Sequence, residues 1–81
     1  MLSFVLVNGI RVHRQEIEGR DESASVNGHG DGTFSWAAAI WAEGERPMVE
    51  SGQGVRAEAD ADRLAEEALN RLRAAWKQAH K

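Results

Sequence analysis

The segment Gly52-Gln53-Gly54-Val55-Arg56-Ala57 matches the glycine fingerprint of dinucleotide-binding proteins, G-x-G-x-x-G/A, and follows a predicted strand. In such a site the helix opens inside the motif, where its amides meet the pyrophosphate, and a second strand supplies an acid about twenty residues later. Here the chain enters its last helix only after the motif and ends in that helix. The sequence therefore favours a glycine bulge in an antiparallel strand over a cofactor site.

A run of alternating acids follows these glycines and could be a cation site. Glu58-x-Asp60-x-Asp62 resembles the start of a calcium loop, but Arg63 stands where the sharp turn needs glycine, and Leu69 stands where a bidentate glutamate belongs. Acids in the first turn of a helix satisfy its free amides and complement its positive end. We therefore interpret Asp60 as the N-cap of the helix.

The histidines and hydroxyl residues do not form an evident catalytic set. His29-Gly30-Asp31 offers two metal ligands, but His13 and His80 lie in other predicted elements, so no second close pair is expected. The chain has no cysteine, and no serine or threonine has an evident base partner. We expect no catalytic residue, no metal and no cofactor, and hence no enzyme. A small hydrolase-like activity that uses the loop 18–32 is the alternative.

Length and charge narrow the class of protein. The 81 residues form one predicted domain, 1–81, which can bury only about 60–65% of its unfolded surface. Without disulfides, association is an available source of stability. A net charge of −3 does not indicate the basic surface that nucleic-acid binders usually have. The apolar start, 1–7, lacks a basic leader and is shorter than a membrane span. We expect a cytoplasmic protein that binds neither nucleic acid nor membrane.

Hydrophobic patterning predicts four strands and one helix. The strands are expected at about 2–7, 10–17, 33–42 and 48–57, and the helix at about 61–79. Asn8-Gly9 predicts a tight hairpin between the first two strands, because both positions tolerate positive φ. The stretch 18–32 is polar and rich in glycine, which indicates a loop, with a short edge strand at 22–26 as an alternative. The alanines of the third strand leave a short helix at 35–43 open.

The last third of the chain predicts the helix most firmly. Its apolar residues recur at intervals of three and four and form one stripe; they are Leu64, Ala65, Ala68, Leu69, Leu72, Ala75, Trp76 and Ala79. The predicted fold is α+β, an antiparallel sheet of three to four strands packed against one C-terminal amphipathic helix. The basic end of this helix is the alternative site for nucleic acid, although acids are interleaved there.

The third strand is apolar on both sides, which is unusual for a sheet with one solvated face. One side, with Phe34, Trp36, Ala38 and Ile40, can pack on the helix. The other side must face something else. The predicted partner-binding residues are Trp41, Ala37, Ala39, Val5 and Val7. A two-fold homodimer that packs these faces together would complete the core, and a foreign protein is the alternative occupant.

The segment from Gly32 to Trp76 resembles the strand, turn, strand and helix layout of HicB-type antitoxins and of some phage anti-CRISPR proteins. The matching residues are Phe34-Ser35-Trp36, Glu43-Gly44, Asp60 and Ala65-Glu66-Glu67-Ala68-Leu69. The resemblance implies a non-enzymatic protein-binding role, either as an inhibitor of a bacterial defence complex or as an antitoxin-like regulatory domain. HicB-type antitoxins usually carry a further DNA-binding segment. Because this chain stops at Lys81, the resemblance does not lead us to expect DNA binding.

Overall fold

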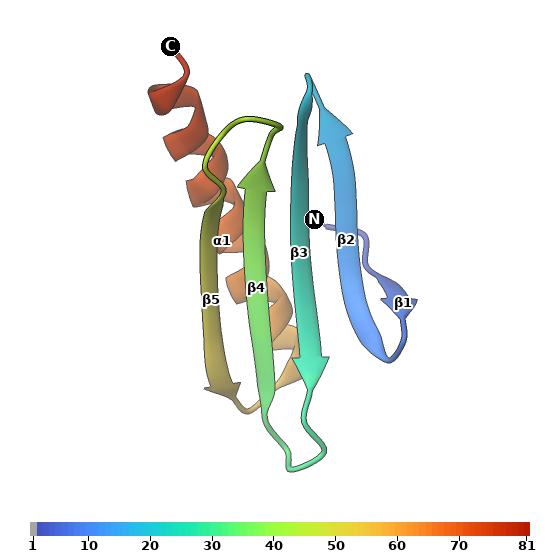
Figure 1. Cartoon of the computed structure of the whole chain (residues 1–81). Coiled ribbons are helices and arrows are strands. Elements are labelled where there is room, and N and C mark those ends of the chain that lie inside the picture. The colour runs from blue at the N-terminus through green and yellow to red at the C-terminus, as the bar shows by residue number, and fades with distance from the viewer. Residues whose placement is uncertain (1) are drawn as a thin grey trace.

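The computed structural model describes residues 2–81, which form five strands and one helix (Figure 1). In chain order they are β1 (Val5–Val7), β2 (Ile10–Ile17), β3 (Arg20–Gly28), β4 (Phe34–Trp41), β5 (Met48–Val55) and α1 (Glu58–Ala79). The strands form one antiparallel sheet in the order β1-β2-β3-β4-β5, and α1 crosses one face over β3, β4 and β5. The predicted class and layers are confirmed, but the sheet has five strands instead of three or four.

The additional strand is β3, which lies in the stretch predicted to be mainly a loop. It is a central strand, paired with β2 and β4. A two-residue turn joins it to β2, and in this turn Glu18 and Gly19 have φ values of 52° and 81°. The first hairpin uses the same conformation at Asn8 and Gly9, as predicted. Glutamate rarely adopts positive φ, so the second hairpin has no comparable sequence signal.

The side chains of β3 also explain why the sequence suggested at most a short edge strand at 22–26, whereas β3 is a long central strand. Its inward positions are Glu22, Ala24 and Val26, all buried against the helix, and its outward positions include Ser23 and Ser25. A glutamate, an alanine and two serines are weak strand formers, so local propensity does not predict a strand here. Pairing with strands on both sides decides the conformation instead.

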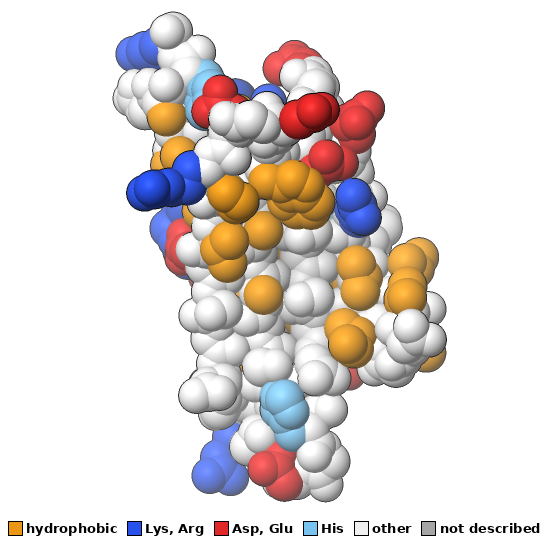
Figure 2. All heavy atoms as spheres, viewed as in Figure 1, with side chains coloured by type: hydrophobic (Ala, Val, Ile, Leu, Met, Phe, Trp, Pro, Cys, Tyr) orange, Lys and Arg blue, Asp and Glu red, His pale blue; other side chains and the backbone are white. Residues whose placement is uncertain are grey.

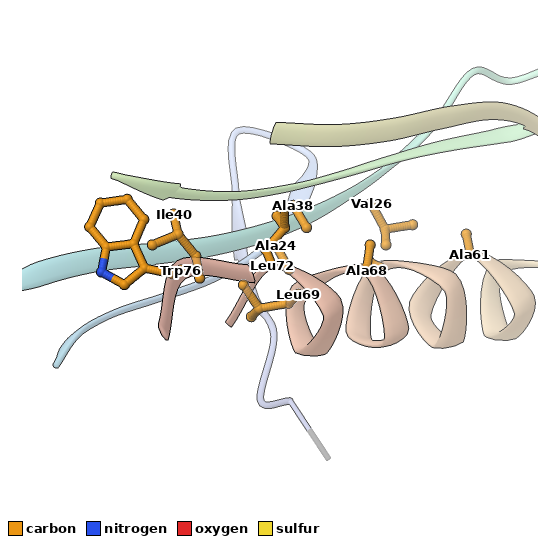
Figure 3. Packing of buried hydrophobic residues seen from close by; sticks show 10 residues of the cluster. Ala24, Val26, Ala38, Ile40, Ala61, Ala68, Leu69, Leu72 and Trp76 are labelled. Atoms are coloured by element: carbon orange, nitrogen blue, oxygen red, sulfur yellow. The ribbon is translucent and has the colours of Figure 1, made fainter. Parts of the chain in front are cut away.

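The core lies between α1 and the inner face of the sheet (Figure 3). Alanines of the helix and of β3 and β4 let the two layers lie close, whereas Trp76 and Ile40 fill one end of the layer. The buried helix residues are Ala61, Ala65, Ala68, Leu69, Leu72 and Trp76. Most of the predicted stripe is thus confirmed, but Leu64 is only half-buried and Ala75 and Ala79 are exposed. In residues 2–81, no helix is both long and apolar enough to cross a membrane.

The helix begins earlier than predicted and without the predicted cap. Its first residue is Glu58, and the N-cap is Ala57, which makes no side-chain capping hydrogen bond. Asp60 therefore lies inside the first turn and is not the N-cap. Asp62 accepts hydrogen bonds of 2.6 and 2.7 Å from Nη1 of Arg11 on β2. The acids of this segment serve a tertiary contact with the sheet as well as the helix end.

The outer strands are shorter than predicted. β1 covers only Val5–Val7 of the expected 2–7, because Leu2 and Phe4 leave the sheet and pack against the core. β5 ends at Val55 instead of 57. Just before its end, Gly54 has a φ of 75°, and the pairing with β4 shifts register at this point. The expected glycine bulge is confirmed.

Gly52 permits a close approach of another side chain. A Cβ at this position would lie 2.6 Å from Nε1 of Trp36, the residue that faces it on β4. The indole therefore lies against the backbone of β5, and only glycine leaves room for it. This glycine of the dinucleotide-like fingerprint has a packing role.

Candidate functional site

The second face of the sheet is the candidate site. The helix lies behind the sheet in Figure 1, so Figure 2 shows the face that it does not cover, which we call the open face. Hydrophobic side chains gather there in two groups, one over β4 and β5 and one over β1 and β2. White surface, which is backbone and polar side chains, separates the groups. No segment among residues 2–81 is packed over the open face in either view.

The strand register assigns residues to this face. Val5, Val12, Ser25, Ala37 and Ser51 lie in one row across all five strands. Side chains of paired residues point to the same side of a sheet, and those two residues apart along a strand share that side. A second row, parallel to the first, contains Arg14, Ser23, Ala39 and Val49.

All five predicted partner-binding residues lie on the open face, but the structure does not bring them into one patch. Ala37, Ala39 and Trp41 lie together on β4 with Val49 of β5 beside them, and we call these four the tryptophan group. Val5 and Val7 lie with Val12 on the first hairpin, and we call these three the valine group. β1 and β4 are three strand spacings apart, which is about 14 Å. Strand β3, predicted at most as a short edge strand, lies between the groups.

Val49 is a residue of this site that sequence reasoning did not find. Its side chain is 61% exposed, and Val5 is 63% exposed. In the structure Val49 pairs with Ala39. The sequence does not determine this register of β5 against β4, because it depends on how the hairpin between them closes. Large apolar side chains with such exposure mark an interaction surface when they lie near one another.

Arg14 adds a positive charge at the edge of the tryptophan group. Its guanidinium lies over the ring of Trp41, 5.4 Å from the centroid, and 3.8 Å from Oδ1 of Asp21. A cation over an indole face is attracted by the electrons of the ring. The contact also shields part of the tryptophan from water, which agrees with its half-buried state. The tryptophan group therefore has one polar side.

The other residues with possible chemistry are engaged in local contacts. His29 contacts Ser35 through Nε2 at 3.0 Å. Asp31 accepts hydrogen bonds from the amide and the hydroxyl of Thr33, and these bonds lower the pKa of Asp31. Such contacts close the turn between β3 and β4. Within residues 2–81, no three acid, histidine or cysteine side chains are placed to hold a metal.

A buried carboxylate joins the sheet to the helix. Glu22 is fully buried and accepts hydrogen bonds from Nε and Nη2 of Arg73 at 3.0 and 2.7 Å, and from Nε2 of Gln15 at 3.0 Å. Nε of Arg20 lies 3.5 Å away. Burial by itself would raise the pKa of Glu22, but these hydrogen bonds and the two arginine charges outweigh it and lower the pKa. The cluster positions β3 against α1.

A second charged contact joins the turn after β4 to the end of α1. The ring of His80 stacks on Trp76 with 4.2 Å between centroids. Its Nδ1 lies 2.9 Å from the carbonyl oxygen of Trp76, and its Nε2 lies 3.1 Å from Oε2 of Glu45. Both partners are acceptors, so both ring nitrogens donate only in the protonated form. The carbonyl contact and the carboxylate contact therefore raise the pKa of His80.

The raised pKa of His80 predicts a stability change near neutral pH. The folded state binds this proton more tightly than the unfolded state, whose pKa is near 6.5. The contribution is fully present below pH 6.5 and is lost as pH rises through the folded pKa. Urea melts across this range should show falling stability for the wild type. His80→Gln should show a smaller fall, and an equal fall in both proteins would contradict the assignment.

The fold and the open face define a small α+β sheet-and-helix domain in which α1 covers one face of the sheet and leaves the other uncovered. A scan against protein families and searches of curated proteins and of solved structures found no match.

Proposed function

We propose that the protein is a non-enzymatic protein-binding module that binds its partner through the open face. The observation that carries this proposal is the tryptophan group, an apolar cluster on a sheet face that α1 does not cover. A domain of 81 residues has few apolar side chains beyond those that its own core needs. The half-buried Trp41 and the exposed Val49 on β4 and β5 therefore favour a partner that buries them.

The charges of the open face favour a protein over a nucleic acid. Arg14 lies there with Glu16 and Asp21, which are paired with each other across β2 and β3. The whole chain carries a charge of −3. Phosphate contacts need clustered lysine or arginine, since released counterions supply most of the affinity. Mixed charges beside apolar groups are compatible with a protein interface, whose rim is usually polar.

A second copy of the chain is the partner that we propose first. The tryptophan and valine groups lie on opposite sides of β3, where Ser23 and Ser25 are small. A two-fold axis that passes between the groups can place the tryptophan group of one copy on the valine group of the other. Small serines at the centre allow two sheets to approach to about 10 Å. Closed two-fold pairs are also the commonest oligomers.

The size of the open face fits this dimer. Five strands at about 4.8 Å and about eight residues at 3.3 Å give a face of roughly 600 Å², or roughly 1,200 Å² for both copies. That area is at the lower limit of stable specific interfaces. We therefore expect association at micromolar concentration.

Trp41→Lys tests the proposal, because it places a charge in the proposed dimer interface. Light scattering at micromolar concentration should show a wild-type dimer and a folded Trp41→Lys monomer. The free energy needed to bury an unpaired charge exceeds the free energy that the dimer interface contributes. Leu6→Lys is the matched control. Leu6 is 72% exposed, but it lies on the other side of β1. The control should remain dimeric, and a wild-type monomer would contradict the homodimer.

Two narrower functions within the same class are supported only by the layout of the chain. An inhibitor that occludes a bacterial defence complex would present the open face to its target. An antitoxin-like regulatory domain would present it to a toxin. In both cases Trp41→Lys should abolish the complex while Leu6→Lys preserves it, which can be measured once a neighbouring gene product suggests the target.

A further inference from the structure

The two edges of the sheet are protected to different degrees. On one side, β1 is three residues long, and the remaining edge of β2 carries the charged residues Arg14 and Glu16. On the other side, β5 offers eight residues that pair only with β4. An unpaired strand presents a row of free N–H and C=O groups to another strand. The edge of β5 is therefore the longer one, and it is less protected against pairing with another strand.

The side chains of β5 do not obstruct pairing. Val49 and Ser51 point to the open face, and Val49, Ser51 and Gln53 are all exposed and uncharged. Charged side chains and prolines are the usual devices that block an edge, and neither occurs at these positions. Pro47 and the bulge at Gly54 lie at the two ends of this stretch. Together they delimit a short accessible edge.

The one charge on β5 is already compensated from the helix side. Glu50 lies on the helix side of β5, where Oε1 accepts a hydrogen bond of 2.7 Å from Nη2 of Arg71. The Arg71 side chain is 57% exposed, and that of Glu50 is 34% exposed. Both therefore remain accessible at the edge of the sheet. Their contact also raises the pKa of Arg71.

We infer that the edge of β5 pairs with the same edge of a second copy, antiparallel about a two-fold axis through Ser51. In this register Val49 faces the partner's Gln53, Ser51 faces the partner's Ser51, and Glu50 faces the partner's Gly52. No like charges stand opposite each other. The five-stranded sheets would then join into one continuous sheet, with both helices on the same side.

Charge complementarity selects a second copy as the occupant. Two copies bring two Glu50 carboxylates and two Arg71 guanidinium groups to the axis, and these can alternate in sign around it. Each arginine then has the carboxylate of the other copy as a second partner. Opposite charges across neighbouring strands favour the pairing, whereas like charges oppose it.

This pairing is independent of the proposed open-face dimer, because it uses the sheet edge and the helix side. A single strand pair is a small interface, so we expect it to be weak, with a Kd of about 10⁻³ M. The test therefore uses Trp41→Lys, in which the open face is blocked. A failure of the edge inference in this variant would leave the open-face proposal untouched.

The experiment follows backbone amide NMR shifts of Trp41→Lys from about 0.05 to about 1 mM, which spans the expected Kd. The amides of residues 48–53 should shift with concentration, and those of β1 and β2 should not. Adding Glu50→Lys gathers four like charges at the axis and should abolish the shifts. Adding Arg71→Glu as well reverses both charges, restores the alternation and should recover them.

The amide spectrum of each variant also reports whether it is folded. Spectra of Trp41→Lys that do not change up to about 1 mM would overturn the inference, since a Kd of about 10⁻³ M leaves much of the protein paired there. Shifts that persist with Glu50→Lys, or that map to β1 and β2, would also overturn it.

Discussion

Arg73→Met should destabilise the protein by about 3 kcal/mol, because it leaves the fully buried Glu22 carboxylate without its main partner. Removing one member of a buried ion pair typically costs about 3–5 kcal/mol. We expect the lower end of this range, since Gln15 and Arg20 remain beside the carboxylate. Urea unfolding at pH 7, followed by tryptophan fluorescence, measures the change.

Arg71→Met is the matched control, because it removes an arginine of the same helix whose ion pair is exposed. Such pairs contribute less than about 1 kcal/mol, so this variant should remain close to the wild type. Replacing Glu22 and Arg73 together by methionine should recover part of the loss, because the buried carboxylate is then removed, while Arg20 keeps Glu18 as a partner. Equal effects of Arg73→Met and Arg71→Met would contradict the buried cluster.

The lowered pKa of Glu22 gives the same cluster a pH signature. The unfolded state binds this proton more readily than the folded state, so the contribution is present above the ordinary pKa of 4.5 and is lost as pH falls through the folded value. Stability of the wild type should therefore drop in acid. The double methionine variant should lose less over the same range.

Leu72→Ala should cost about 2–4 kcal/mol, because it leaves a cavity between α1 and the sheet. Leu72 is 6% exposed and lies in the cluster that contains Ile40 and Trp76. The loss is a large fraction of the total stability expected for a small domain, about 5–15 kcal/mol or less. Urea melts of the variant and the wild type measure it.

Leu6→Ala provides the comparison for this second result. The residue type and the substitution are the same, but Leu6 is 72% exposed, so the change should stay within about 0.5 kcal/mol. A shift below about 0.5 kcal/mol for Leu72→Ala would mean that this side of the helix does not face the core.

The elements with strong local signals were predicted well. The spacing of Leu69, Leu72 and Trp76 identified the helix and its buried side, and Asn8-Gly9 identified the first hairpin. Strands β2, β4 and β5 were placed within about two residues, the precision that local patterns allow. In these segments local preference and the final fold agree, so the pattern suffices.

The elements that depend on distant partners were predicted poorly. Asp60 has the side chain of an N-cap, but α1 begins three residues earlier than predicted, and Asp62 binds Arg11 of β2. β3 contains Glu22, whose burial is tolerable only beside Arg73, 51 residues away. No local pattern can reveal such compensation, because the charge pair forms only when sheet and helix meet.

The candidate site shows the same division. The alternation of β4 predicted that Ala37, Ala39 and Trp41 share a face opposite to Ile40, and the observed strand confirms this and contradicts the short helix left open at 35–43. Only the tertiary structure decided what lies beside them. It placed β3 between the tryptophan and valine groups and brought Val49 next to Ala39. Side-chain alternation is a property of one strand, whereas neighbours across a sheet are chosen by pairing between segments far apart in the chain.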